Sequence, residues 1–408
     1  MIRLTFFLLF SLFLSAADFK IGLELLLSNH PEYKKFRAEH VRGKRIALLT
    51  NHTGVDRLKR ANVDLLTLHP DFNLVKLFSP EHGIRGKIKA GAKVANDKDP
   101  KTGLQIISLY GKRGFMPLKE DLADVDLLIY DIQDVGSRAY TYIWTLERSL
   151  IACGKYGVDV MVLDRPCPFG GTVIDGPICE PKTKSLLTNV PIPRVYGMTV
   201  GEMARYFYYE YNRQCRLIVV PMQGWKRGMR MEKTAAPWVG PSPNIPNLHA
   251  AYCFPATGTI GLSGQLHIGI WTKYPFQMLG APWMNAANSA TDLNNLKLPG
   301  VSFKPISFVS PKGIFKGKQV NGFLFDVSNP LVFRPATTEL AMMMYFSANY
   351  PNDFLWEKDR FKAFDRAMGT TSVRKMIMEG VTFEKILGHW AAQQVKFRTA
   401  RKKYLIYK

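Results

Sequence analysis

The amino-acid sequence predicts an α/β protein with a Rossmann-like, doubly wound and mostly parallel sheet, followed by a second, smaller α+β domain. The main observation is that six short apolar runs between residues 45 and 222 alternate with stretches of helical periodicity. The runs are rich in Val, Ile and Leu with little polar alternation, which is typical of strands covered on both faces. The length of 408 residues also fits two domains better than one.

The elements of the first domain follow from their sequence patterns. A helix is expected over 137–157, where Gly157 suits a C-terminal cap. A second helix is expected over 199–211, where Thr199 and Glu202 have the spacing of a capping box. The expected strands are RIALLT (45–50), LVKLFS (74–79), LQIISLY (104–110), VDLLIYDI (125–132), VDVMVLD (158–164) and LIVVPM (217–222).

The composition of the chain changes near residue 240, where we place the domain boundary. The stretch APWVGPSPNIPNLH (236–249) is rich in proline and is typical of an irregular connector. Beyond it, the expected elements are the strands VSFKPISFV (301–309) and VNGFLFDVS (320–328) and helices at 337–349, 371–379 and 381–403. The sequence therefore predicts a Rossmann-like domain over 18–240 and an α+β domain over 241–408.

The first 17 residues have the pattern of a secretory signal peptide. An early Arg3, an apolar run over 4–14 and the small residues Ser15 to Ala17 match its charged, apolar and cleavage regions. The run is too short to span a bilayer comfortably, and no later segment reaches the ~18 apolar residues that a spanning helix needs. We therefore expect an exported protein, periplasmic or secreted, without stable membrane insertion after cleavage.

The charge balance points to an anionic partner. Lys and Arg total 55 against 33 Asp and Glu, which gives a formal net charge of +22. Such an excess favours nucleic acid, an acidic membrane face or an acidic polysaccharide. Export argues against nucleic acid, so no nucleic-acid partner is expected. The oligomeric state is left open.

Several chemistries lack their sequence signatures. The five cysteines form no CxxC pair, and their odd number leaves at least one thiol unpaired. The eight histidines are scattered without HxxxH or HxH spacing, so no metal site is predicted. There is no GxSxG nucleophile motif and neither a GxGxxG nor a GxxxxGK[ST] phosphate-binding motif. We therefore expect no cofactor, and acid-based chemistry remains.

Three expected strands run directly into polar sequences, namely SPEHGIRG, QDVGSRAYTY and RPCPFGG. In open α/β sheets ligands bind outside the carboxyl ends of the strands, so we expect these side chains to converge on one rim. Several carboxylates at one rim indicate a functional cleft. The candidate residues are Glu81, His82, Arg85, Asp131, Gln133, Asp134, Arg138, Tyr140, Asp164 and Arg165.

Glu81 is the leading catalytic candidate. A carboxylic acid in a partly apolar cleft has a raised pKa and can donate a proton near neutral pH. The structural alternative is a turn cap or a surface ion pair with Arg85 or Arg138. His82 could tune Glu81 or simply hydrogen-bond a backbone carbonyl.

The other acids carry similar alternatives. Asp131 lies at the strand end itself and ranks above Asp134 for substrate contact, because Asp134 could instead be the N-cap of a helix that starts near Ser137. Asp164 could do no more than hold Arg165.

Several long motifs are similar to those of one family. LLTNHTGVD, LFSPEHGIRG, DIQDVGSRAYTYIWTL, LDRPCPFGG, YGMTVGEMA and PWVGPSPNIP resemble the bacterial exo-β-N-acetylmuramidases of the NamZ type, formerly a domain of unknown function. The likeness continues to the terminal WAAQQVKFRTARKKYLIY and covers nearly the whole mature chain. The resemblance implies a Rossmann-like domain, a smaller C-terminal domain and an active cleft between them.

The resemblance also implies an exo-acting glycoside hydrolase that releases N-acetylmuramic acid from the non-reducing end of peptidoglycan fragments. Glu81, in the SPEHG motif, would be the general acid for a β-1,4 glycosidic bond. Asp131 or Asp134 could act as base or nucleophile, or the substrate's own acetamido group could attack. The candidates for binding the sugar's carboxylate are Arg85, Arg138 and Arg165.

One segment departs from the family pattern. Where such proteins read close to FEGTNxSxGRGTTxPFE, this chain reads GLSGQLHIGIWTKYPFQ (261–277). The first acid of the motif is absent, Ile270 stands in place of its Arg, and Gln277 replaces its final Glu. The alternative prediction is a catalytically impaired, cell-wall glycan-binding protein that keeps the cleft.

Overall fold

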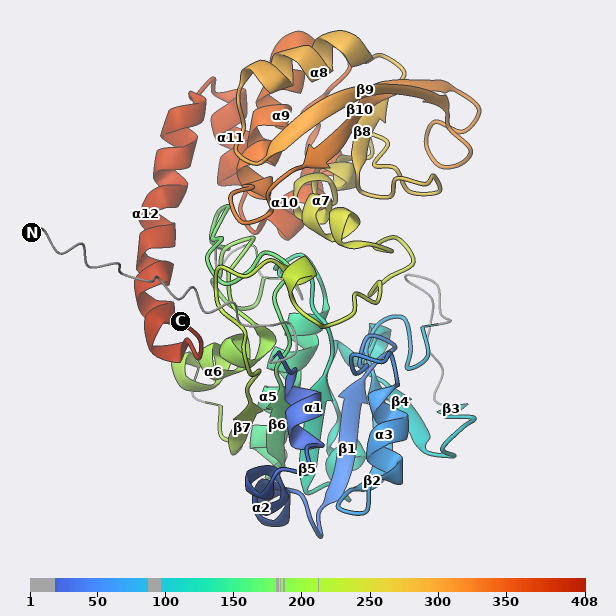
Figure 1. Ribbon diagram of the computed structural model, residues 1–408. Coiled ribbons are helices and arrows are strands. Elements are labelled where there is room, and N and C mark those ends of the chain that lie inside the picture. Colours follow the sequence, from blue (N-terminus) through green and yellow to red (C-terminus); the bar gives the residue numbers. More distant parts are fainter. Residues whose placement is uncertain (1–18, 87–96, 181–182, 184, 186–187, 212) are drawn as a thin grey trace, which may run out of the picture.

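The computed structural model describes residues 19–408 apart from 87–96, 181–182, 184, 186–187 and 212 (Figure 1). The expected signal peptide, residues 1–17, lies outside the described residues. No helix in the described part of the chain is long and apolar enough to cross a membrane. The five cysteines, all of them described, are buried and free.

A seven-stranded sheet forms the centre of the first domain. Its order is β3-β4-β2-β1-β5-β6-β7, and all neighbours pair in parallel except β3, which runs antiparallel to β4. Each of the six strands expected from the sequence is present. The bounds are β1 Arg45–Thr50, β2 Asn73–Ser79, β3 Asp97–Lys98, β4 Gln105–Ser108, β5 Leu127–Asp131, β6 Asp159–Leu163 and β7 Leu217–Val220.

Strand β1 is buried on both faces, as its unbroken apolar run predicts. Ala47 and Leu49 belong to the core cluster that contains α5 and α6, whereas Ile46 and Leu48 belong to the cluster on the other face, with α1 and α3. The doubly wound prediction is therefore confirmed. The helices of this domain are α1 Gly22–Leu26, α2 Pro31–His40, α3 Asn62–Leu68, α4 Lys119–Leu122, α5 Tyr142–Tyr156 and α6 Val200–Glu210.

Both helices expected from the sequence of this domain are present. Thr199 and Glu202 form the predicted capping box at the start of α6, and Gly157 ends α5 in the left-handed conformation that favours glycine. Helix α5 begins at Tyr142, later than predicted, because residues 132–141 form the loop that leaves β5.

The direction in which successive strands are added to the sheet reverses between the parallel neighbours β1 and β5. From β1 the chain builds outward through β2 and β4, and from β5 it builds the other way through β6 and β7. Such a topological switch point separates the loops that follow the two central strands and is where open α/β sheets bind ligands.

The second domain has a smaller antiparallel sheet in the order β8-β10-β9. Its core contains Phe303, Phe323 and Phe346, with α8 and α9 packed near the sheet (Figure 1). The predicted α+β character is confirmed, although α7, α8, α10 and β8 were not recognised from the sequence. The bounds are β8 Met278–Ala281, β9 Val301–Val309, β10 Gln319–Val327, α7 Leu248–Thr257, α8 Ala286–Asn295, α9 Pro335–Asn349, α10 Lys358–Met368 and α11 Ser372–Met378.

Helix α12, Phe383–Arg401, connects the two domains along one side of the molecule (Figure 1). Its Trp390 belongs to the core of the second domain, and its Phe397 packs 5.5 Å from Tyr206 in the core of the first. After α12, the Tyr407 hydroxyl donates to Asp164 at 2.5 Å. The end of the chain therefore packs on the first domain in space, although it lies in the segment 241–408 that was predicted to form the second domain.

We expect Phe397→Ala to lower the free energy of unfolding by about 3–5 kcal/mol, because it removes a buried aromatic ring from the junction between α12 and the first domain. Val395→Ala on the exposed side of the same helix is the control and should change stability by less than about 0.5 kcal/mol. Chemical denaturation measures both. Equal effects would show that α12 is not anchored through Phe397.

Candidate active site

The carboxyl ends of the parallel strands carry the polar groups of the candidate site. Glu81 follows β2, and Thr141 lies in the loop after β5. The Thr141 hydroxyl donates to Glu81 Oε2 at 3.3 Å, which joins the two predicted motifs. Glu81 itself is half-buried. The structure thus brings the leading candidate to the edge of the sheet where ligands are expected.

Three tyrosines surround Glu81. Burial raises the pKa of Tyr110 to about 12, and the neighbouring Glu81 carboxylate adds to the shift. Burial also raises the pKa values of Tyr140 and Tyr142, and Glu81 contributes to both. All three hydroxyls therefore stay protonated at neutral pH.

One hydroxyl and one amide group near Glu81, those of Tyr140 and Asn51, lack well-aligned hydrogen bonds within the described part of the chain. The Tyr142 hydroxyl donates to Pro241 O at 2.7 Å, and Asn51 Oδ1 accepts from Thr53. The Tyr140 hydroxyl and Asn51 Nδ2 are buried, and neither finds a well-aligned partner among the described residues. A buried polar group without a partner is costly, so these groups are suited to binding a polar ligand.

The backbone around Glu81 is unusual. His82 is buried and adopts the left-handed conformation (φ 74°), and Gly83 follows with φ 75°. Gly86, also at positive φ, packs so closely on the ring of His52 that a Cβ would fall 2.6 Å from its Cγ. His52 in turn donates from Nε2 to Gly240 O at 2.8 Å, and burial lowers its pKa. The loop after β2 is therefore fitted against the loop after β1.

Sequence reasoning missed Asn51, His52, Tyr110, Thr141 and Tyr142 as site residues. The signal was present, because the run TNHTG breaks the apolar pattern directly after β1 and Tyr110 follows β4 in the same way. Applying the rule to the ends of β1 and β4 would have included Asn51, His52 and Tyr110, whereas Thr141 and Tyr142 are uncharged residues within the recognised segment QDVGSRAYTY.

Asp131 and Arg165 form a buried ion pair rather than an open binding site. Arg165 Nε lies 2.5 Å from Asp131 Oδ1, and its Nη2 lies 2.9 Å from Oδ2. Asn62 Nδ2 also donates to Asp131 Oδ2 at 2.7 Å, and Arg165 Nη1 donates to Val55 O. Asp164, expected to hold Arg165, does so through the backbone amide of Arg165 at 2.9 Å, whereas the guanidinium pairs with Asp131.

Asp134 and Gln133 are also internal. Asp134 Oδ2 accepts from Gly136 N at 2.8 Å and from the Tyr196 hydroxyl, so it is not the N-cap of α5. Burial raises its pKa to about 6 although these hydrogen bonds oppose the shift. Gln133 Nε2 donates to the backbone oxygens of Asp134 and Pro166.

The remaining candidates have partners within the protein. Asp164 accepts from the Thr199 and Tyr407 hydroxyls and from two backbone amides, and burial raises its pKa to about 7. Arg138 is fully buried and donates to the carbonyls of Ile192 and Met368. These contacts argue against a role for Arg138 in binding the sugar's carboxylate. Arg85 pairs with Asp64 and Asp99.

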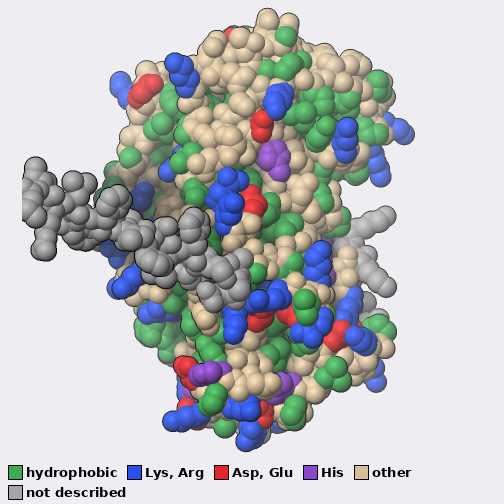
Figure 2. Space-filling model, viewed as in Figure 1, with side chains coloured by type: hydrophobic (Ala, Val, Ile, Leu, Met, Phe, Trp, Pro, Cys, Tyr) green, Lys and Arg blue, Asp and Glu red, His purple; other side chains and the backbone are tan. Residues whose placement is uncertain are grey.

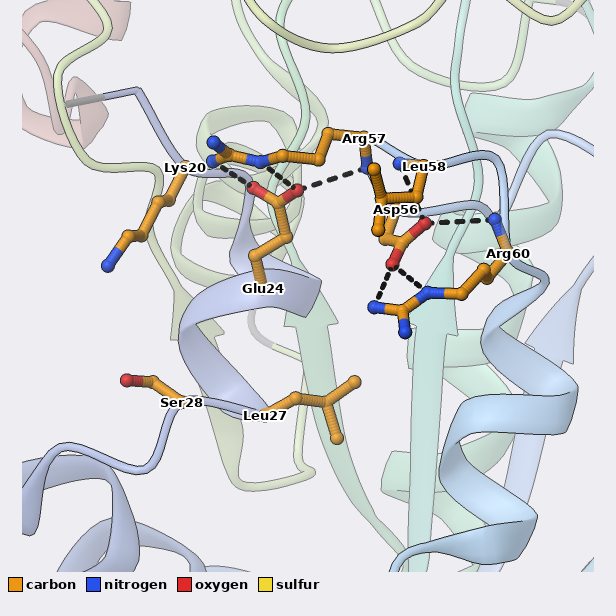
Figure 3. A pocket seen from close by; sticks show the side chains of 8 residues that line it. All are labelled: Lys20, Glu24, Leu27, Ser28, Asp56, Arg57, Leu58 and Arg60. Atoms are coloured by element: carbon orange, nitrogen blue, oxygen red, sulfur yellow. Dashed lines mark hydrogen bonds and ion pairs between the residues drawn. The ribbon is translucent and has the colours of Figure 1, made fainter. Parts of the chain in front are cut away.

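A pocket of about 320 Å³ lies elsewhere in the first domain (Figure 3). Its charged side chains pair with one another, Glu24 with Arg57 and Asp56 with Arg60. In the part of the chain that the structure describes, no group of three or more His, Cys, Asp or Glu side chains could hold a metal ion.

Most of the chain matches one family. The profile of the N-terminal domain of the exo-beta-N-acetylmuramidase NamZ matches residues 46–249, and that of its C-terminal domain matches residues 252–407. The chain belongs to the NamZ family. This confirms the resemblance seen in the sequence and the enzyme class that it implies, a glycosidase.

Similar proteins agree with this assignment. The peptidoglycan beta-N-acetylmuramidase NamZ of Bacillus subtilis (strain 168) is 40% identical over 386 residues, which cover 95% of this chain and 91% of that protein. A crystal structure of a DUF1343 family protein from Bacteroides fragilis superimposes with a TM-score of 0.88 at 35% identity, over 96% of this chain and 99% of the other. A second such protein from the same organism gives 0.74 at 30% identity, with the same coverage.

The segment in which this chain departs from the NamZ pattern lies close to the site. Phe276 packs 5.0 Å from Phe254, which packs 5.6 Å from Tyr140. Ile270 packs against the same core cluster as Tyr140. Gln277 Oε1 lies 2.8 Å from His249 Nδ1. Because His249 Nε2 accepts from Val327 N, Nδ1 carries the proton and donates to Gln277.

We expect Asp131→Ala to lower the free energy of unfolding by about 3–5 kcal/mol, because it leaves the buried guanidinium of Arg165 without its carboxylate. Asp326→Ala, which breaks an exposed pair with Lys304, should cost less than about 1 kcal/mol. Denaturant unfolding measures the free energy of unfolding of both variants. Similar losses would contradict the structural role of the Asp131 pair.

Asp134 should make stability depend on pH. Because its pKa is raised in the folded protein, its contribution is fully present below pH 4 and is lost as pH rises through about 6. Asp134→Asn keeps an oxygen for Gly136 and Tyr196 and does not titrate. Relative to the wild type, the variant should therefore gain on the order of 2–3 kcal/mol between pH 4 and pH 7. Unfolding curves at four pH values measure this gain, and parallel curves would contradict it.

Proposed function

We propose that this protein is an exo-acting glycoside hydrolase that releases N-acetylmuramic acid from the non-reducing end of peptidoglycan fragments, with Glu81 as the general acid. Membership of the NamZ family and the named activity of the Bacillus subtilis relative support the substrate class. The observation that carries the role of Glu81 is its place after β2, half-buried and hydrogen-bonded to Thr141 beside three protonated tyrosines.

A general acid must hold its proton until the glycosidic oxygen takes it. The Tyr140 hydroxyl and Asn51 Nδ2, both buried without a well-aligned partner among the described residues, are suited to hydrogen-bonding the hydroxyl and acetamido groups of a sugar. Glu81 would then protonate the leaving oxygen while an oxocarbenium-like centre develops on the sugar.

The second catalytic group is better supplied by the substrate than by the protein. Asp131 is paired with Arg165, and Asp134 is buried with its Oδ2 bound to Gly136 and Tyr196. Both carboxylates already have partners within the protein, which argues against a nucleophilic role for either. The acetamido oxygen of the sugar can attack its own anomeric carbon, a known exception to the scheme with two carboxylates.

Export to the periplasm or the medium is part of this proposal. It rests on the charged, apolar and small-residue pattern of the first 17 residues, which lie outside the described part of the chain. An exported enzyme would meet peptidoglycan where that polymer is found. The net charge of +22 suits a substrate that carries carboxylates.

A glycan-binding protein without turnover is the second candidate. The changes in the segment 261–277 favour it, since Leu262 and Ile270 offer no charged group and Gln277 replaces an acid. Purified wild-type protein incubated with peptidoglycan fragments separates the two candidates. Binding without release of N-acetylmuramic acid would establish the second.

We expect Glu81→Gln to reduce turnover by about 10²–10⁴-fold with near-normal folding, because it removes the proton donor. The loss should be larger for peptidoglycan fragments than for a nitrophenyl muramide, whose leaving group departs without a proton. Release of N-acetylmuramic acid from both substrates is the measurement. Glu120→Gln, at an exposed position in α4, is the matched control and should behave like the wild type. Undiminished release by Glu81→Gln would remove Glu81 from the mechanism.

A further inference from the structure

Trp271 is a large aromatic side chain that the fold leaves in solvent. It is 55% exposed, although Trp144 and Trp390 are almost fully buried. Its backbone adopts the left-handed conformation with φ 71°, which is rare for a bulky residue. An exposed tryptophan costs the protein apolar burial, and its backbone conformation adds strain. Such a combination points to a function for the side chain.

A tight turn holds Trp271 in this position. Thr272 donates from its amide to Gly269 O at 3.0 Å and from its hydroxyl to the same oxygen at 2.7 Å. Trp271 therefore occupies the third position of the turn 269–272, where glycine or asparagine is usual when φ is positive. Tyr274 N also donates to the Thr272 hydroxyl, so the turn is fixed on both sides.

The tip of the β9–β10 hairpin packs beside the indole. A Cβ on Gly313 would fall 2.4 Å from Trp271 Cζ3, so only glycine allows this approach. Lys312 Nζ lies 5.9 Å from the centre of the indole ring. Ile314, in the same tip, is 55% exposed. Ser310 N donates to Lys318 O at 3.0 Å and Gly317 N donates to Ser310 O at 2.8 Å, so hydrogen bonds close the hairpin tip beside Trp271.

The charge of this surface has one sign. The segments 262–276 and 310–319 contain no Asp or Glu. We call Trp271, Lys273, Lys312, Ile314, Lys316 and Lys318 the Trp271 platform; all six side chains are exposed. In the space-filling view, hydrophobic and basic side chains are interleaved over the upper right, where Figure 1 places the hairpin (Figure 2).

Packed aromatic rings connect the segment that carries Trp271 to the candidate active site. Phe276, five residues after Trp271, packs 5.0 Å from Phe254, which packs 5.6 Å from Tyr140. Tyr140 is one of the three tyrosines around Glu81. A polymer held at Glu81 would thus have a second surface on the neighbouring domain to contact.

We propose that the Trp271 platform is a second binding site for the peptidoglycan strand, which rests on the proposed function. The apolar face of a sugar ring stacks on an indole, and lysine ammonium groups pair with the carboxylates that muramic acid and its peptides carry. The occupant is an anionic glycan rather than a lipid surface. Isolated apolar side chains between lysines fit a sugar ring, and packed aromatic rings connect the segment that carries Trp271 to the site that would cut the glycan.

The test measures binding of insoluble peptidoglycan in the Glu81→Gln background, so that turnover does not disturb the equilibrium. Adding Trp271→Ala should weaken binding about tenfold, and Trp271→Phe should weaken it less because a ring remains. Gly313→Ala should also weaken binding, since the new methyl group displaces the indole. Combined Lys312→Gln, Lys316→Gln and Lys318→Gln changes should remove most of the salt dependence of binding.

Tyr209→Ala is the control, because Tyr209 is 61% exposed on α6 and lies outside the platform. It should bind like the parent, and thermal unfolding should show that all variants fold. Unchanged binding by the Trp271→Ala and Gly313→Ala variants would overturn the proposal. Loss of binding to phosphatidylglycerol vesicles instead of peptidoglycan would overturn it in favour of a membrane surface. Failure of the proposed function is separate, since the wild type would then bind peptidoglycan without releasing N-acetylmuramic acid.

Discussion

The buried ion pair between Asp131 and Arg165 holds together the edge of the sheet on which the candidate site is built. Asp131 ends β5, Arg165 follows β6, and the guanidinium also reaches the backbone of Val55 after β1. Asn62 at the start of α3 binds the same carboxylate. One pair therefore fixes the loops of three adjacent strands at the topological switch point. The acids that looked most catalytic in the sequence serve largely to shape the rim, and Glu81 is the acid that remains half-exposed on it.

The connector between the domains is bound to the same rim. The Tyr142 hydroxyl donates to Pro241 O, and His52 donates to Gly240 O. Beyond the connector, Phe254 packs on Tyr140. Helix α12 returns to the first domain and places Tyr407 on Asp164. The second domain is therefore attached to the first at both ends of its sequence, which fixes the segment 261–277 near Glu81.

This arrangement explains how a chain can depart from its family pattern and still keep a site. Gln277 is engaged by His249 and Ile270 by the core, so the altered segment is packed against its surroundings. The same segment presents Trp271 and Lys273 to solvent beside the lysines of the hairpin. Under the two proposals, the first domain would supply the proton donor, and the second domain would supply the surface that binds the acidic glycan.

Local sequence patterns were enough to predict the six parallel strands, the capping box at Thr199, the glycine cap at Gly157 and the strand end that carries Glu81. These features depend on local patterns, namely unbroken apolar runs and residues with strong backbone preferences. Each pattern can be recognised from a short stretch of sequence. It also indicated the family, because long motifs survive along the chain.

The pairing of the polar groups, by contrast, is visible only in the folded chain. Asp131 and Arg165 are 34 residues apart, and Arg138 reaches the carbonyl of Met368 across 230 residues. The local sequence around a charged residue at a strand end does not show whether its side chain faces a substrate or pairs with a partner in the interior. Pairing depends on which distant loops the sheet brings together, and the free energy of burying a charge selects the partner that satisfies it.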